Sequence, residues 1–200
     1  MAGQVKHKQI FSGIVPDLKM MALLARLALK NTDSLIGAVA DALSRDGIVL
    51  LSSTALLQDQ LATPGAMTRR RPSADALKDV EYGRDVARAL AGFDIGQTVV
   101  VKDRAAVAVE AMEGTDEVIR RAGRIAGPGC TVVKVAKPRQ DVRFDVPVVG
   151  PGTVAAMREA GAATLAVQAG ATLLLDRTDL LAEADRAEVA VWGFEAPSPR

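Results

Sequence analysis

The residues whose side chains could take part in catalysis or ligand binding are concentrated between positions 94 and 153 of this chain. Carboxylates that can hold a hard cation alternate there with lysine and arginine side chains that can bind phosphate. The polar residues are Asp94, Gln97, Glu110, Glu113, Thr115, Asp116, Lys134, Lys137, Gln140, Arg143 and Asp145, followed by the sequence Gly150-Pro151-Gly152-Thr153. Short runs of Val and Ala separate them, so the pattern predicts a polar site on a scaffold of strands. Such a set of groups suits attack on a phosphoanhydride.

Other common catalytic chemistries find little support in the composition. His7 is the only histidine and lies between two lysines near the N-terminus, so we expect no Ser-His-Asp triad. Cys130 is the only cysteine, which excludes an internal disulfide, and the apolar run after it predicts a buried thiol. With one residue of each type, a zinc site is not expected either. What remains is hydrolysis by water that is activated by a carboxylate, by carboxylate-bound Mg²⁺, or by both.

Local sequence leaves the roles of several of these residues open. Glu113 and Asp116 flank Thr115, which can cap a helix, and acidic residues are common in first helical turns for capping alone. Asp145 follows Arg143 in a loop bounded by proline, where a carboxylate can form a structural pair or serve as a fixed base. Lys134 and Lys137 are three positions apart, so their side chains should point to opposite faces of a strand unless the strand ends between them.

Net charge and composition exclude several classes of partner. The 200 residues carry a formal charge of only +1, with one Trp, one Tyr and four Phe, so nucleic acid is not expected to bind. The chain has neither an apolar run long enough to span a membrane nor a secretory signal, and we expect a cytoplasmic location. The run Arg69-Arg70-Arg71 is interpreted as a solvated hinge, or as a site for an anionic ligand or lipid headgroup.

Periodicity predicts a two-domain layered α/β fold in which strands alternate with helices. We expect the remnant of an N-terminal α/β domain over residues 1–66, a linker over 67–75, and a complete C-terminal α/β domain over 76–196. In the first part, the predictions are helices at 17–30, 34–47 and 54–60 and a strand at 48–51. In the second part, Ser73 caps a long helix, and further helices are predicted at 115–123, 153–161 and 178–187. Strands are predicted at 98–101, 106–112, 131–136, 165–168, 172–175 and 189–192.

The order of these motifs resembles one known family. The segments Asp94-Ile95-Gly96-Gln97, Ala108 through Asp116 and Lys134 through Pro147 are similar to the C-terminal domain of the LpxI-type UDP-2,3-diacylglucosamine pyrophosphatases of lipid A biosynthesis. The resemblance extends from about residue 82 to residue 193, and residues 1–66 look like the second part of that family's N-terminal domain. Because the family begins with a Gly-containing strand and helix before the point that corresponds to Met1, we expect an incomplete first domain.

The resemblance implies a Mg²⁺-dependent hydrolase that splits a UDP-linked diacylated glucosamine at the α-phosphate, with UMP and 2,3-diacylglucosamine 1-phosphate as products. It implies a catalytic role for Asp145 and Mg²⁺ ligation by Glu113, Asp116 and Asp145. The residues expected to bind substrate are Gln97, Glu110, Thr115, Lys134, Lys137, Gln140 and Arg143. A lipid substrate also implies transient contact with the inner membrane surface as a peripheral protein, and a homodimer is compatible with the family.

Two alternatives remain open at this level. The first is a non-catalytic module that binds a nucleotide sugar or a lipid phosphate, left by the expected N-terminal truncation. The second is a phosphohydrolase that acts on a soluble nucleotide sugar.

Overall fold

The computed structural model describes residues 40–138, 142–143 and 145–196. The chain divides into two compact units, residues 1–52 and 53–200, and each is described by itself. In the first unit, residues 40–45 are helical, and the helix ends at Gly47, whose φ of 80° is left-handed, as predicted. The strand predicted over 48–51 is wrong, because the Ile48 N–H bonds back to the Leu43 carbonyl at 3.0 Å instead of entering a sheet. The predicted helix over 17–30 lies outside the described residues.

The second unit is built around a six-stranded sheet with the strand order β1-β8-β6-β4-β2-β3. The three central strands, β4, β6 and β8, run parallel, and β1, β2 and β3 pair antiparallel to their neighbours. In that order the strands are β1 (Gly65–Ala66), β8 (Ala190–Phe194), β6 (Thr164–Gln168), β4 (Thr131–Lys134), β2 (Thr98–Lys102) and β3 (Ala105–Val109).

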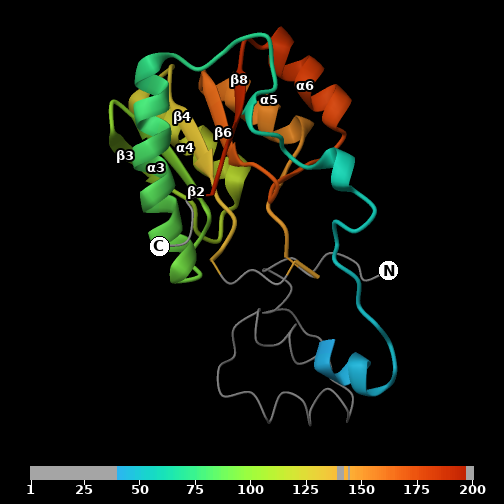
Figure 1. Cartoon of the computed structure of the whole chain (residues 1–200). Coiled ribbons are helices and arrows are strands. Elements are labelled where there is room, and N and C mark those ends of the chain that lie inside the picture. The colour runs from blue at the N-terminus through green and yellow to red at the C-terminus, as the bar shows by residue number, and fades with distance from the viewer. Residues whose placement is uncertain (1–39, 139–141, 144, 197–200) are drawn as a thin grey trace. The chain divides into compact units, whose positions relative to one another are not determined.

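Helices cover both faces of this sheet, which makes three layers (Figure 1). The long helix α3 (Ala74–Gly92) packs on one face. The opposite face carries α4 (Thr115–Ala126), α5 (Pro151–Ala160) and α6 (Arg177–Arg186). Val99 and Val101 pack in the core beneath α3, whereas Val100 between them packs in the core beneath α4. This alternation follows from the two-residue period of a strand, and it confirms the layered α/β prediction.

Two local features hold α3 on its face. Ser73 caps the helix, because its hydroxyl accepts a hydrogen bond of 3.1 Å from the Ala76 N–H, and this prediction is confirmed. Gly83 lies directly on the sheet, where a Cβ would come within 2.7 Å of the Val133 side chain. The absence of a side chain at Gly83 therefore sets how closely α3 packs against β4.

A second, two-stranded sheet lies beside the first and contains β5 (Val148–Val149) and β7 (Leu173–Leu174) in parallel. The helix predicted over 54–60 is wrong, because only the short 3-10 helix η2 (Gln58–Gln60) forms there. Arg177 binds this segment instead, since its guanidinium donates hydrogen bonds to the carbonyl oxygens of Asp59 and Leu61. The backbone of residues 59–61 is thus held by α6 in addition to the hydrogen bonds of its single 3-10 turn.

Candidate active site

A buried lysine at the carboxyl end of β4 forms the centre of the polar site. Lys134 is only 4% exposed, and its Nζ donates a hydrogen bond of 2.6 Å to the hydroxyl of Thr115. That hydroxyl donates in turn to Oε1 of Glu110 at 2.8 Å, and Oε2 of Glu110 accepts a bond of 3.3 Å from the Gln97 N–H. The structure therefore brings together four of the residues that the sequence predicted to bind substrate.

The strand register explains why these side chains meet. Thr98 pairs with Lys134 across β2 and β4, and the Glu110 N–H bonds to the Thr98 carbonyl at 2.9 Å. All three positions continue the sheet face that is covered by α4, and α4 begins at Thr115. The site thus lies at the carboxyl ends of parallel strands, where α/β sheets usually place their ligands.

Opposing effects act on the charge of Lys134. Burial lowers the pKa of its ammonium group, whereas the negative charges of Glu110, Asp116 and Asp145 act in the opposite direction, and the net result is a lowered pKa. Glu110 is itself only 7% exposed. Lys134 and Glu110, both buried, are joined through the hydroxyl of Thr115.

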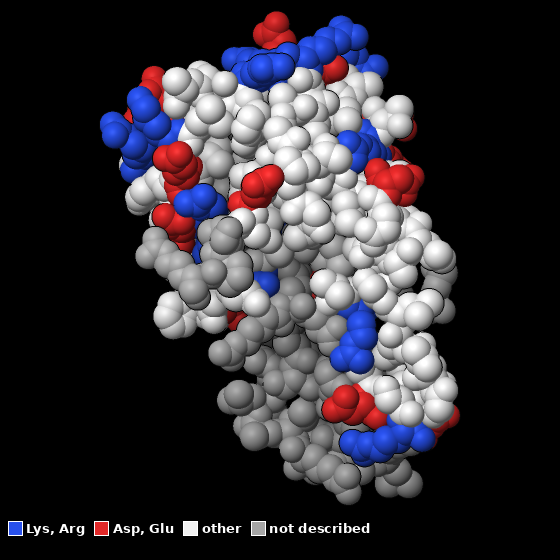
Figure 2. All heavy atoms as spheres, in the orientation of Figure 1, with Lys and Arg blue, Asp and Glu red and all other residues white. Residues whose placement is uncertain are grey.

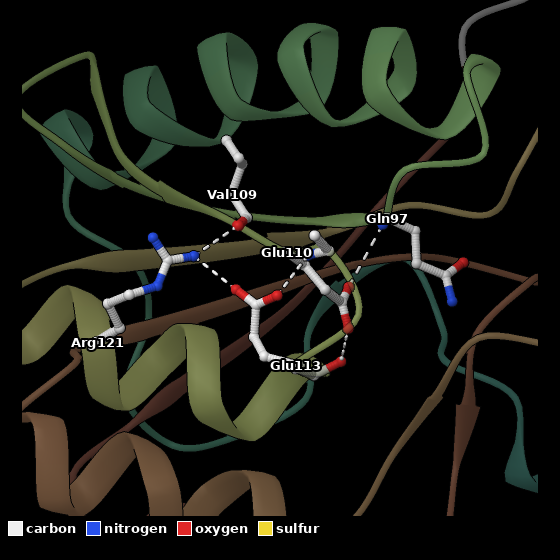
Figure 3. Close-up of polar contacts among 7 residues, drawn as sticks. Gln97, Val109, Glu110, Glu113 and Arg121 are labelled. Carbon is white, nitrogen blue, oxygen red and sulfur yellow. Dashed lines mark hydrogen bonds and ion pairs between the residues drawn. The ribbon is translucent and has the colours of Figure 1, made fainter. Parts of the chain in front are cut away.

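Glu113 is part of a different set of contacts, which Figure 3 shows around Arg121. The Arg121 guanidinium donates a hydrogen bond of 2.6 Å to Oε1 of Glu113 and one of 2.8 Å to the Val109 carbonyl. Oε2 of Glu113 accepts a bond of 3.0 Å from the Ala111 N–H. Burial alone would raise the pKa of Glu113, but the backbone hydrogen bonds and the Arg121 contact outweigh it, and the net pKa is lowered. These contacts tie the loop between β3 and α4 to the body of α4.

Asp116 joins the first turns of two helices. Its Oδ1 accepts a hydrogen bond of 3.1 Å from the hydroxyl of Thr153, the third residue of α5. Beside this contact lies an open hollow of about 560 Å³, lined by residues of both helix starts, including Gly114, Gly150 and Gly152. The partial positive charge of a helix N-terminus favours anions, and two such ends meet here.

Thr153 was not among the predicted site residues. The sequence Gly150-Pro151-Gly152-Thr153 was a usable signal, because proline is favoured at the first helical position and α5 does begin at Pro151. Thr115 differs from its predicted capping role. The N-cap of α4 is Gly114, and no side chain caps this helix, because the Thr115 hydroxyl is directed to Glu110 instead.

Asp145 lies beside Lys137. The Lys137 Nζ is 3.4 Å from Oδ2 of Asp145 and 2.5 Å from Oδ1 of Asp94, whose φ of 57° places it in the left-handed region. The side chain of Asp145 is 38% exposed, whereas that of Lys137 is 16% exposed. Because β4 ends at Lys134, the opposite-face rule does not extend to Lys137. Asp145 is near both lysines, since its charge also acts on Lys134.

The three predicted Mg²⁺ ligands do not form one group. Among the described residues, no three His, Cys, Asp or Glu side chains gather closely enough to hold a metal ion. Asp116 and Asp145 are both near Lys134, whereas Glu113 is bound to Arg121. This arrangement still fits Mg²⁺, because proteins usually hold that ion with one or two carboxylates together with waters and substrate phosphates.

The remaining sequence-predicted residues are less informative. Gln140 lies outside the described residues. The Arg143 carbonyl accepts a hydrogen bond of 2.8 Å from the Ser53 hydroxyl, which anchors the loop before β5. Cys130 is 1% exposed, as predicted, and burial raises the pKa of its thiol.

The arginine run lies at the other end of the sheet from Lys134. The Met67 N–H donates a hydrogen bond to the Val191 carbonyl, and the chain continues from there past the amino end of β8. At that end the Arg70 guanidinium donates a hydrogen bond to the Glu188 carbonyl. Arg69 forms an ion pair of 3.6 Å with Asp185. Figure 2 shows Lys and Arg side chains gathered along this end of the second unit. In the part of the chain that the structure describes, no helix has both the length and the apolar character to cross a bilayer.

Comparison with known proteins agrees with the geometry. Residues 1–60 match the family model of the LpxI N-terminal domain, and residues 63–192 match that of the LpxI C-terminal domain. The chain is also 31% identical, over 205 aligned residues, to a Caulobacter vibrioides protein named UDP-2,3-diacylglucosamine pyrophosphatase LpxI, and the alignment covers 97% of this chain and 73% of the relative. The prediction of two α/β domains is thereby confirmed. Because both domain models match in order along one chain whose polar site has the predicted residues at its centre, this chain belongs to the LpxI family.

Proposed function

We propose that this protein hydrolyses UDP-2,3-diacylglucosamine to UMP and 2,3-diacylglucosamine 1-phosphate in lipid A biosynthesis, with Mg²⁺ as its cofactor. Family membership and the name of the relative support the substrate. The observation that carries the proposal is a buried ammonium group, Lys134, with two carboxylates, Asp116 and Asp145, near it. A pyrophosphate needs fixed positive charge as its bond breaks, and its attack needs a carboxylate that can direct water or hold a metal ion.

The carboxylates have two tasks in this proposal, and Asp145 takes part in both. Asp145 directs the attacking water and accepts its proton, and the Lys137 ammonium at 3.4 Å keeps that carboxylate in place. Asp116, oriented by Thr153, and Asp145 are the residues that would hold Mg²⁺. When bound, that ion supplies Lewis-acid stabilisation of charge on the phosphoryl oxygens. Glu113 contributes by holding the loop that leads into α4.

The positively charged groups bind the pyrophosphate. Lys134 and Lys137 each bring an ammonium group to the carboxyl end of β4, and the starts of α4 and α5 add partial positive charge. The acyl chains of the substrate also require at least transient contact with the inner membrane surface. Cosedimentation with vesicles of anionic phospholipid, with and without substrate, tests this part of the proposal.

The direct test measures UMP released from UDP-2,3-diacylglucosamine by the purified full chain with Mg²⁺. We expect turnover that stops with excess EDTA and returns when Mg²⁺ is restored. Binding of UDP without release of UMP would instead support a non-catalytic module, and equal turnover of a UDP-sugar without acyl chains would assign a soluble substrate. Hydrolysis in ¹⁸O-labelled water locates the attack. Label in UMP supports the α-phosphorus implied by the resemblance, whereas label in the sugar phosphate assigns the β-phosphorus.

A further inference from the structure

We propose that Glu110 and Thr115 act on the reaction through Lys134, as positioning residues that hold its ammonium group toward the phosphates without contacting the substrate themselves. This inference rests on the proposed function, and it changes the expectation from the sequence, which assigned all three residues to substrate binding.

The hydroxyl of Thr115 is already committed within the protein. A threonine hydroxyl has a single proton to donate, and that proton goes to Oε1 of Glu110 at 2.8 Å. The oxygen of the Thr115 hydroxyl accepts a hydrogen bond of 2.6 Å from the Lys134 ammonium. A phosphate oxygen is an acceptor and needs a donor, so Thr115 has no proton left to offer it.

Glu110 is unsuited to contact a phosphate for a different reason. One oxygen of its carboxylate accepts from the Thr115 hydroxyl and the other from the Gln97 N–H, and the residue is 7% exposed. An ionised carboxylate has no proton to donate, and its charge repels a phosphate. Its charge favours the ammonium form of Lys134, which burial disfavours. The effect of Glu110 on the reaction therefore passes through Lys134.

Lys134 is the member of this chain of contacts that still has donors to use. An ammonium group has three N–H donors, and in the described part of the chain Thr115 is its one hydrogen-bond partner. The hydrogen bond to Thr115 fixes the position of the buried ammonium through one N–H, and its other N–H groups can donate to an anionic oxygen. Without the Thr115 hydroxyl, the ammonium would lose both its fixed position and its link to Glu110.

A double-mutant cycle tests the proposal through kcat and KM for UMP release. Lys134→Met and the near-isosteric Thr115→Val are made singly and together. We expect each single variant to lose about 10- to 100-fold in kcat with a smaller change in KM, as a charge-assisted contact predicts. The double variant should lose no more than Lys134→Met alone. Thr115→Ser, which keeps the hydroxyl, should restore activity to within a few-fold of the wild type.

A second cycle with Glu110→Gln in place of Thr115→Val repeats the test without changing side-chain size. Glu81→Gln, on the exposed face of α3, is the matched control and should leave kcat unchanged. Thermal unfolding of every variant identifies any that fails to fold, and if Thr115→Val does, the cycle with the size-conserving Glu110→Gln carries the test. Losses that multiply in the double variants would overturn the proposal, because they would mean that Thr115 or Glu110 contacts the substrate directly.

Calorimetric titration with UDP separates failure of this inference from failure of the proposed function. If the wild type binds UDP but releases no UMP, the proposed hydrolysis fails, and the same cycles measured on UDP affinity still decide the positioning role. Non-additive losses of affinity support it, and additive losses overturn it.

Discussion

The hydroxyl of Thr153 donates a hydrogen bond of 3.1 Å to the carboxylate of Asp116, and so connects the first turn of α5 with the first turn of α4. The two residues are 37 positions apart in the chain. A carboxylate held in this way loses rotational freedom before any ligand arrives. Where a carboxylate binds a metal ion, hydrogen bonds of this kind tune the affinity of the site for that ion.

Replacing Thr153 with valine should therefore weaken the response of the enzyme to Mg²⁺. A hydrogen bond to a charged group contributes about 1.5–3 kcal/mol, so we expect the Mg²⁺ concentration for half-maximal UMP release to rise by roughly 10-fold or more. Thr153→Ser keeps the hydroxyl and should behave like the wild type. An unchanged Mg²⁺ dependence in Thr153→Val would show that Asp116 does not hold the ion.

Asp145→Asn should remove most of the activity and leave the fold intact. The substitution keeps the size of the side chain but removes the base and the charge that faces Lys137, and losing a general base costs about 100-fold or more. The carboxylate is 38% exposed and forms no part of the apolar cores, so the unfolding temperature should change little. UMP release and thermal unfolding measured on the same preparation check both parts.

Asp94→Asn is the matched control, because Asp94 binds the same lysine at 2.5 Å. We expect a smaller loss of activity for Asp94→Asn, since that residue holds Lys137 but is not assigned to the water. Equal losses in the two variants would contradict the separate role given to Asp145.

Much of the second unit could be predicted from sequence, because its signals are local. The run Thr98 through Val101 is β-rich, Ser73 is a strong helix cap, and most predicted strands and helices of this unit form close to their predicted bounds. The strand predicted over 106–112 ends at Val109, and the two-residue strands β1 and β5 were not predicted. The failures near residues 48–51 and 54–60 have a common cause. Both segments carry apolar residues, but the Ile48 N–H bonds to the end of the preceding helix. The later segment forms only a 3-10 turn, whose Asp59 and Leu61 carbonyls accept from Arg177, a contact that no periodicity reveals.

The candidate site was predictable in residue type but not in pairing. Carboxylates and lysines near strand ends were visible in the sequence, and the order of the motifs indicated the family. Which carboxylate faces which cation depends on side-chain direction at the ends of β3 and β4. Glu110 and Glu113 are three positions apart, yet one is joined to Lys134 through Thr115 and the other is bound to Arg121.

Glu113→Gln should lower stability in a pH-dependent way while leaving the Mg²⁺ dependence of the activity unchanged. The variant loses the ion pair with Arg121, a partly exposed interaction that contributes roughly 1 kcal/mol. Because folding lowers the pKa of Glu113, its contribution is present above the ordinary glutamate value of about 4.3 and disappears as the pH falls through the lower folded-state value. Urea unfolding of wild type and variant at neutral pH and at acid pH checks this.

At neutral pH the wild type should be the more stable, and the difference should shrink as the pH falls below the ordinary glutamate range. A matched substitution, Glu117→Gln, removes the other glutamate near the start of α4, an exposed residue that pairs with the half-buried Arg120. If Glu113→Gln changes the Mg²⁺ concentration for half-maximal UMP release, Glu113 is a ligand of the metal ion and this prediction is wrong.

Gly96→Ala tests whether the close approach of the chain before β2 to the end of β3 limits stability. A Cβ at position 96 would lie 2.1 Å from the Glu110 carbonyl oxygen, which is backbone and cannot rotate away. We expect a loss of about 1–3 kcal/mol in the free energy of unfolding, and a loss of activity as Gln97 moves away from Glu110. Gly92→Ala, at the end of α3, is the control because a Cβ there meets nothing within 4 Å. That variant should be equal to the wild type or more stable by about 0.4–1 kcal/mol. If both variants unfold at the same urea concentration, the packing between Gly96 and Glu110 does not hold this end of the site in place.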